Sequence, residues 1–408
     1  MSAVDNLAEK KTPTAVLCGP DTGIAFVGCG YVADFYAATL PNHRLNLRGV
    51  FDARQERAET FGAFHKVPVY PSIEAILADD SVEIVVNLTN PSSHYDVSRR
   101  CLEAGKHVYS EKPLALRLDH ASDLLELASR RGLGLSSAPC SLLSETAQSL
   151  WHALRGGVIG QPRLAYAELD DGAIHQMPFQ NWISISGAPW PYVDEFRTGP
   201  IMEHAGYYVT WLTAFFGPAT AVTSYAGLLV PDRLAGVDPG PPAPDFACAV
   251  IEFASGVIAR LTCGTVAPEN HTFTIVGDEG VLSVDDCWNF GAPVTVRTRA
   301  DSARARHHYL TGPRTYPLVR PADYPHRYTD THDMDFARGV ADLAASVRGE
   351  GRQHLTAEHA VHVLEIVLAM ARSAAEPARV RIDSTFAPLA PQDWATDQFE
   401  ADVVALRS

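Results

Sequence analysis

Residues 24–33 read IAFVGCGYVA, an apolar run followed by the pattern Gly-x-Gly-x-x-Ala. The pattern predicts a strand that turns sharply into a helix, with Gly28 making the bend and Gly30 letting a pyrophosphate approach the backbone. Ala33 permits close packing of helix on strand, and the amides of the helix N-terminus would face the phosphates. The stretch therefore predicts a dinucleotide site formed by Gly28, Gly30, Tyr31, Val32 and Ala33.

A second predicted strand, Leu45 to Phe51, ends at Asp52, 24 residues after Gly28. At about this spacing a carboxylate meets the ribose hydroxyls of the adenosine half. This favours NAD, because the 2′-phosphate of NADP would face a fixed negative charge. Arg54 keeps NADP as the less favoured alternative, since a nearby arginine can accommodate that phosphate. An ordinary turn at a strand end is the other interpretation of Asp52.

From this turn to about Cys140, apolar runs alternate with helical patterns, which is typical of βαβ units and a parallel sheet. We expect a doubly wound α/β Rossmann domain at 21–140, behind a flexible tail at 1–20. Its other predicted strands are Glu83 to Leu88, His107 to Tyr109 and Leu133 to Ser136, and its predicted helices are Ser72 to Ala78, Tyr95 to Ala104 and His120 to Ser129.

Beyond Ser141 the sequence becomes rich in β patterns, and Gly277-Asp278-Glu279-Gly280 is typical of a hairpin turn. We expect a large, mostly antiparallel sheet in an α+β domain at 141–390, which would bind substrate and self-associate, followed by a C-terminal tail at 391–408. The predicted strands are Arg163 to Leu169, Ala221 to Leu229, Phe246 to Phe253, Val257 to Thr265, Thr272 to Val276 and Val281 to Val284. Late helices are predicted at Met334 to Arg348 and Ala357 to Ser373, the second capped by Thr356.

Composition excludes several classes of protein. The chain has 33 basic and 48 acidic residues, a formal net charge of −15 that would repel nucleic acid. Seven scattered cysteines without a CxxC pair are typical of reduced thiols, and no metal site is expected. The first twenty residues lack a sustained apolar core, so we expect no signal peptide, no membrane contact and a cytoplasmic location.

Residues 105–115 read GKHVYSEKPLA. This Glu-Lys-Pro signature after a strand resembles the family of glucose-fructose oxidoreductase, inositol dehydrogenase and MocA. Residues 87–91 (NLTNP), 157–160 (GVIG) and the region from His271 to Leu282 agree with it. The resemblance implies a homo-oligomeric (dimeric or tetrameric), NAD-dependent oxidoreductase acting on sugar-like small molecules. It assigns to Lys112 a contact with substrate beside the nicotinamide, and to the cofactor site Thr89, Asn90, Pro91, His94, Glu111 and Lys112.

The place of Lys112 agrees with independent physics, since ligands of open α/β sheets bind outside the carboxyl ends of the strands. A partly desolvated lysine there would have a lowered pKa and polarise or deprotonate a hydroxyl. A surface lysine after a strand is the alternative interpretation.

A helix is predicted to begin near Gly199 and to stop at Gly217-Pro218. On a regular helix Glu203 and Tyr207 share one face. Many relatives carry Asp and His at these two positions, and the His exchanges the substrate proton. Here Tyr207 would take that role if Lys112 lowers its pKa, with simple aromatic packing as the alternative. His204 is the competing relay, although it would point about 100° away from Glu203.

The long stretch 171–197 is rich in aromatic residues that suit a sugar ring, and an oligomer contact would explain it equally well. The expected substrate-binding residues are His175, Trp182, Trp190 and Tyr192. A second feature is the arginine-rich segment between residues 297 and 327. Such a segment could bind a substrate phosphate, but more commonly it is a solvated loop or a subunit contact. Its arginines are Arg297, Arg299, Arg304, Arg306, Arg314, Arg320 and Arg327.

The function expected from these features is alcohol–ketone interconversion on a sugar, a cyclitol or a sugar derivative. Lys112 polarises the reacting oxygen, Tyr207 relays the proton and Glu203 orients them. Two alternatives stay open: elimination of a glycosidic group through transient oxidation by NAD, and a sensor that binds the dinucleotide without turnover.

Overall fold

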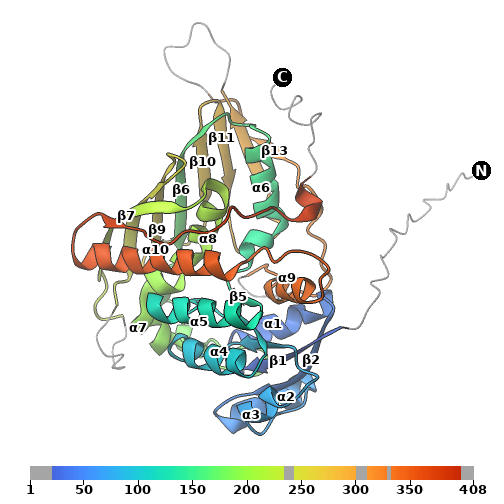
Figure 1. The fold of residues 1–408 in the computed structure, drawn as a ribbon. Helices are drawn as coiled ribbons and strands as arrows, with labels where there is room; N and C mark the ends of the chain where they lie inside the picture. Colours follow the sequence, from blue (N-terminus) through green and yellow to red (C-terminus); the bar gives the residue numbers. More distant parts are fainter. Residues whose placement is uncertain (1–20, 234–242, 300–309, 329–331, 397–408) are drawn as a thin grey trace, which may run out of the picture.

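The computed structural model describes residues 21–233, 243–299, 310–328 and 332–396 (Figure 1). The tail expected at 1–20 and residues 397–408 of the tail expected at 391–408 lie outside the described residues, as do Arg304 and Arg306.

Five parallel strands in the order β2-β1-β3-β4-β5 form the first sheet. β1 and β3 are buried along their whole length, which explains why both are continuous apolar runs. The strands are β1 (Thr22–Val27), β2 (Leu45–Phe51), β3 (Ile84–Asn87), β4 (His107–Ser110) and β5 (Leu135–Ser137). The helices of this part are α1 (Ala33–Thr39), α2 (Gln55–His65), α3 (Ile73–Leu77), α4 (His94–Glu103) and α5 (Leu118–Arg131).

The register of this sheet positions the site. Val27 pairs with both Phe51 and Asn87, and Asn87 pairs with Ser110. β1, β2, β3 and β4 therefore end at one level. The residues that follow them, which include Gly28, Asp52, Leu88 and Glu111, lie along one edge.

Nine strands form the second sheet, in the order β13-β12-β11-β10-β6-β9-β8-β7-β14. Every pairing is antiparallel except that of β6 with β9. The strands are β6 (Pro162–Asp170), β7 (Ala219–Gly227), β8 (Phe246–Phe253), β9 (Ile258–Gly264), β10 (Phe273–Gly277), β11 (Gly280–Val284), β12 (Val294–Thr298), β13 (Arg314–Tyr316) and β14 (Val380–Arg381). The helices are α6 (Glu145–Arg155), α7 (Tyr192–Glu203), α8 (Ala205–Phe216), α9 (Arg338–Val347) and α10 (Ala357–Ala375).

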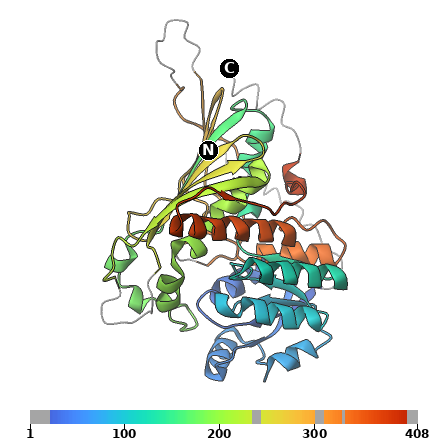
Figure 2. The same ribbon diagram turned by 60° about the vertical axis from the view of Figure 1, so that its left-hand side comes forward.

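Helix α10 joins the two parts. In both ribbon views it crosses between the large sheet and the parallel sheet (Figures 1 and 2), and it packs against β7 and α8 on one side and α5 on the other. The hydroxyl of Thr356 accepts a hydrogen bond from the amide of His359 at 3.3 Å, which confirms the predicted N-cap. The helix therefore serves as a shared wall of both cores.

The fold class predicted from the sequence is confirmed, including the turn between β10 and β11. The helix predicted to run unbroken from Gly199 to Gly217 is wrong, because two helices, α7 and α8, occupy this region. Within the described residues, no helix combines the length and the apolar character needed to cross a membrane. The domain boundaries at 21–140 and 141–390 stay a prediction.

Candidate active site

The glycine turn after β1 has two different glycines. Gly28 has φ of 102°, and a Cβ on it would lie 2.4 Å from the carbonyl oxygen of Leu88. Only glycine fits there, because both the dihedral angle and the neighbouring strand exclude a side chain. A Cβ on Gly30 would have no atom within 4 Å, so open space lies over this residue. The backbone is therefore approachable at Gly30, as a pyrophosphate requires.

Asp52, directly after the neighbouring strand β2, binds the backbone of the glycine turn. Its two carboxylate oxygens accept the amides of Cys29 at 2.9 Å and Arg54 at 2.8 Å. The Arg54 side chain is 77% exposed, and its Nε lies 3.9 Å from the Asp52 carboxylate. Open space over Gly30 and a carboxylate at the end of β2 are what a dinucleotide needs, so the residues present fit NAD.

The turns after β3 and β4 are fastened to each other by His94. This residue is fully buried, with Nδ1 2.7 Å from the carbonyl oxygen of Pro113 and Nε2 2.8 Å from that of Thr89. Protein backbone occupies both ring nitrogens, and the contact of His94 with the cofactor stays a prediction. His94 positions the turns that carry Thr89 and Lys112.

Three other expected cofactor residues also make protein contacts. Thr89 donates its hydroxyl to Asn87 Oδ1 at 2.6 Å, and Pro91 opens a short 3₁₀ turn. The carboxylate oxygens of Glu111 accept the Tyr36 hydroxyl at 2.6 Å and the Lys112 amide at 3.0 Å. Glu111 is buried and thereby fixes the backbone at Lys112.

Lys112 meets Glu203 across the junction of the two parts. The Nζ donates to Glu203 Oε2 at 2.6 Å, and the two side chains are 20% and 7% exposed. Burial opposes the charge of the ammonium, but Glu203, Tyr207, Glu195 and Glu111 together raise the pKa of Lys112 well above its usual range. The expected lowering of its pKa is wrong, because carboxylates surround the amine. Lys112 is therefore an ammonium at neutral pH.

Glu203 and Tyr207 do not share a face of one regular helix. Gly199 has φ of 77°, and Pro200 follows it, so the first helix is broken before its end. A Cβ on Gly199 would lie 2.7 Å from that of Ala243, and packing therefore demands glycine. α7 ends at Glu203 and α8 begins at Ala205. His204, with φ of −114°, forms the joint between them.

Tyr207 is buried and lies edge-on to Trp288, with ring centroids 5.4 Å apart. Burial raises the pKa of its phenol, and the charge of Lys112 offsets this only in part. The expected lowering toward neutrality is wrong, because desolvation outweighs the ammonium. Tyr207 keeps its proton at neutral pH and acts as a hydrogen-bond donor.

Two further carboxyl groups face this centre. Glu195 of α7 has a pKa raised to about 8, first by burial and then by Glu203. Asp171, directly after β6, has a pKa raised to about 7 by burial, with His271 acting in the opposite direction. Both groups can exchange protons near neutral pH, where acid–base catalysis operates.

Three buried nitrogen atoms near Tyr207 have no hydrogen-bond partner among the described residues: His204 Nδ1, His271 Nε2 and Trp288 Nε1. The ring of Trp288 lies 6.1 Å from that of His204 and 4.3 Å from that of His271, centroid to centroid. Unpaired buried polar atoms are rare in proteins and call for a partner. Polar groups of a bound ligand would supply it.

The expected substrate residues separate into two groups. Trp182, Trp190 and Tyr192 pack around Phe179 and Phe196 in a small aromatic core. Of these, Trp190 also lines a small pocket with Glu195, Glu203 and His204. His175 lies elsewhere, in an open hollow beside Met177 and Asp232.

The stretch that carries these aromatic residues touches the edge of the parallel sheet twice. Ser186 donates its hydroxyl to Asp34 Oδ2 at 2.8 Å, and Asp34, directly after the glycine turn, also contacts His65 at 2.6 Å. Asp194 accepts from Asn90 Nδ2 at 2.7 Å. Segment 186–194 is therefore tied beside the ends of both β1 and β3.

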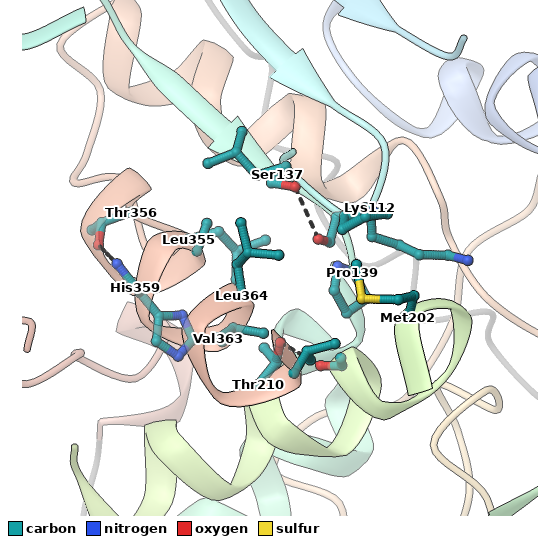
Figure 3. Close-up of a pocket in the computed structure, with 16 residues that line it drawn as sticks. Lys112, Ser137, Pro139, Met202, Thr210, Leu355, Thr356, His359, Val363 and Leu364 are labelled. Atoms are coloured by element: carbon teal, nitrogen blue, oxygen red, sulfur yellow. Dashed lines mark hydrogen bonds between the residues drawn. The ribbon is translucent and has the colours of Figure 1, made fainter. Parts of the chain in front are cut away.

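An apolar pocket lies behind Lys112, between α8 and α10 (Figure 3). Its lining includes Met202, Leu355, Val363 and Leu364. In Figure 3 the side chain of Lys112 extends away from this hollow. The amine is therefore delivered to the Glu203 side and not to the apolar pocket.

Of the described arginines in segment 297–327, Arg297, Arg314, Arg320 and Arg327 bond to protein through their side chains. Arg320 pairs with Glu145 at 2.7 Å, and Arg327 pairs with Asp333 at 2.9 Å. Arg297 pairs across the sheet with Val281, at the far end of the β10–β11 hairpin from His271. These contacts give no support to a substrate phosphate site in this segment.

Sequence reasoning missed four residues of the site: Asp171, Glu195, His271 and Trp288. Asp171 carried one signal, its place directly after a predicted strand. His271 lay within a stretch already matched to the family, but nothing marked its ring. Glu195 and Trp288 carried no local signal, since long-range packing brings them together.

Comparisons with known proteins agree with this geometry. Residues 22–138 match the oxidoreductase family with an NAD-binding Rossmann fold, and residues 147–283 match the GFO/IDH/MocA C-terminal domain. The trans-1,2-dihydrobenzene-1,2-diol dehydrogenases of Macaca fuscata fuscata and Homo sapiens are 25% and 26% identical over 270 and 272 residues, which is 65% of this chain and 75% of each relative.

Two solved structures share the fold. An NAD binding oxidoreductase from Klebsiella pneumoniae superposes with a TM-score of 0.71 at 20% identity, covering 89% of this chain and 99% of the other. The WlbA dehydrogenase from Bordetella pertussis, solved in complex with NADH and UDP-GlcNAcA, superposes with a TM-score of 0.66 at 18% identity, covering 89% and 99%.

Proposed function

Because this chain belongs to the GFO/IDH/MocA family of NAD-binding oxidoreductases, we propose that it interconverts an alcohol and a ketone on a sugar, a cyclitol or a sugar derivative. The chain is a dehydrogenase-type oxidoreductase with NAD as cofactor. The observation that carries the proposal is the Lys112–Glu203 pair, which stands at the carboxyl edge of the parallel sheet where a dinucleotide ends. A relative named for a diol, and a structure of similar fold solved with UDP-GlcNAcA, support a carbinol substrate.

The first group of residues holds the cofactor. Gly28 to Ala33 and Asp52 would hold its adenosine and pyrophosphate, and Thr89, Asn90 and Pro91 would lie beside the nicotinamide. When bound, NAD supplies the ring that takes or gives the hydride. The protein positions the substrate against this ring, excludes water from the site and supplies the charges that act on the reacting oxygen.

Lys112 acts on the reacting oxygen. Its raised pKa keeps it protonated, so it serves as a hydrogen-bond donor and a fixed positive charge beside the oxygen that becomes negative. Glu203 holds the amine in place through their 2.6 Å bond. Tyr207 adds a second neutral donor.

The charges around the site favour an uncharged polyol. Glu195, Glu203 and Asp171 surround Lys112, whereas the nearby Arg233 is already bound to Asp245 at 3.0 Å. An anionic group placed here would meet the Glu203 carboxylate, and the two cations Lys112 and Arg233 are already paired with carboxylates.

Self-association is the second part of the proposal. One face of the large sheet carries exposed apolar side chains at Leu164, Tyr225, Val250 and Ile258. They come from four neighbouring strands, β6, β7, β8 and β9. The Glu168–Arg260 pair lies on the same face. Exposed apolar side chains gathered on one face are typical of a protein interface, and a second copy of the chain would cover them.

The direct test mixes the purified protein with NAD and a panel of polyols, hexoses, inositols and nucleotide sugars. We expect reduced cofactor to accumulate with at least one neutral member, and Lys112→Met to abolish that signal while NADH still binds. The absence of turnover across the whole panel, in both directions, would contradict the proposal.

A further inference from the structure

His204 has one ring nitrogen directed at a carboxylate and the other without a partner. It forms the joint between α7 and α8 and is 8% exposed. Its Nε2 lies 3.8 Å from Asp171 Oδ2, while its Nδ1 is buried and unbonded. The nearby carboxylate favours the tautomer with the proton on Nε2, which leaves Nδ1 as an acceptor. The buried Nδ1 thus lacks the hydrogen-bond partner that a substrate hydroxyl would supply.

Asp171 connects this imidazole to solvent. Its side chain is 27% exposed, whereas that of His204 is 11% exposed. The charged and titratable groups that act on Asp171 are His204 at the helix joint, His271 and Glu269 before β10, Glu195 of α7 and Lys112 after β4. A carboxyl group in this position can receive a proton from the interior and release it to water.

We propose that His204 and Asp171 form a proton relay that carries the hydroxyl proton of the substrate out of the site. The relay rests on the proposed function, because a proton is released only if a carbinol is oxidised. The substrate O–H bond breaks as a bond to Nδ1 forms, and the Nε2–H bond breaks as the Asp171 carboxylate is protonated. The hydride leaves the same carbon in the redox step, with its electron pair, to oxidised NAD. Reduction of the ketone runs the same transfers backwards.

The two carboxyl groups beside Lys112 offer no free base at neutral pH, because Glu203 is bound to the Lys112 ammonium at 2.6 Å and Glu195, with a pKa of about 8, is mainly protonated. Lys112 and Tyr207 keep their protons at neutral pH and therefore have no site to accept another. Burial, reinforced by Lys112, lowers the pKa of His204 to about 3, so the ring is neutral and disfavours a second proton. A relay that takes a proton at one nitrogen while releasing one at the other avoids the imidazolium.

The 3.8 Å separation is longer than a hydrogen bond. Catalytic hydrogen bonds are often long without substrate and shorten when it binds. A hydroxyl bound to Nδ1 would fix the ring, and a rotation of the partly exposed Asp171 carboxylate would then close the gap.

The kinetic test compares Asp171→Asn and His204→Gln with Glu168→Gln as matched control. Glu168 lies on β6, the strand that directly precedes Asp171. Its carboxylate pairs with Arg260 on the face of the large sheet that carries Leu164 and Ile258. The probe is the sugar or cyclitol with the highest rate in the panel. We expect kcat to fall about 100-fold in both relay variants, with KM and NADH affinity within twofold of the parent. The double variant should be no slower than either single one.

The pH profile separates a relay from a merely structural role. In the parent, the oxidation rate should rise with pH through about 7, as Asp171 loses its proton and becomes able to accept one. This limb should vanish in Asp171→Asn and return in Asp171→Glu. An Asp171→Asn enzyme with the control's rate and an unchanged limb would overturn the relay while leaving the dehydrogenase intact.

A second measurement needs no turnover. In protein labelled with ¹⁵N-histidine, NMR should show His204 neutral with its proton on Nε2, and a mixture of tautomers in Asp171→Asn. A proton fixed on Nδ1 in the parent would overturn the relay whatever the assays show. Silence of the parent toward every panel member would refute the proposed function instead.

Discussion

The two glycines of the first turn should separate cofactor binding from folding. In Gly30→Ala the new methyl group meets nothing within 4 Å, so the protein itself has room for it. We expect the free energy of unfolding to be unchanged or to rise by about 0.5 kcal/mol, because alanine restricts the unfolded chain. The methyl would occupy the space through which a pyrophosphate reaches the backbone. NADH should bind about 10- to 100-fold more weakly, a loss of about 1.4–2.8 kcal/mol.

Gly28→Ala should have the opposite effect and mainly reduce the stability of the fold. Its φ of 102° costs an L-residue about 1–3 kcal/mol. The new Cβ would also lie 2.4 Å from the backbone oxygen of Leu88 and 2.8 Å from the backbone nitrogen of Thr89. The backbone after β3 would have to move to relieve these clashes. Overpacking of this kind costs about 1–3 kcal/mol. We expect about 2–6 kcal/mol to be lost from the free energy of unfolding.

The assay pairs NADH fluorescence titration with urea unfolding followed by circular dichroism. Gly351→Ala is the matched control, since a Cβ there also meets nothing within 4 Å and the residue lies between α9 and α10, away from the turn. If Gly30→Ala bound NADH as tightly as Gly351→Ala does, the assignment of the turn to the pyrophosphate would be refuted.

Three other changes test the remaining parts of the site. Glu203→Gln removes the carboxylate that most raises the pKa of Lys112, so the amine should lose its proton at lower pH and the alkaline fall of kcat should begin earlier; an unmoved profile would contradict the pairing. Ser186→Ala removes the hydrogen bond from the Ser186 hydroxyl to Asp34 of α1 and should speed NADH dissociation about fivefold in stopped-flow fluorescence. The control Ser129→Ala, at an exposed position of α5, should leave this rate unchanged. Val250→Glu should shift the protein to a smaller mass in light scattering at unchanged NADH affinity, and a mass equal to the parent's would exclude this sheet face as the interface.

Local pattern was enough to predict most of the fold. β2 and β8 begin and end at the predicted residues, and the cap at Thr356 and the turn at Gly277–Gly280 form as predicted. Each depends on residues close in sequence: the alternation of burial, a capping hydroxyl, a glycine-rich turn. α2 was not predicted, and its weakly segregated polar and apolar residues give the reason.

The sequence by itself determined the chemistry carried by short motifs. The glycine turn, Asp52 and Lys112 each follow a strand, and the carboxyl ends of parallel strands share one edge, so their proximity could be inferred without coordinates. Only the tertiary structure decided the partners and the proton states. Glu203 reaches Lys112 from 91 residues away, and Asp171 and Trp288 reach His204 from separate strand ends. The pKa values of Lys112 and Tyr207 depend on burial and on neighbours contributed by distant elements, because desolvation and charge act through space and not along the chain.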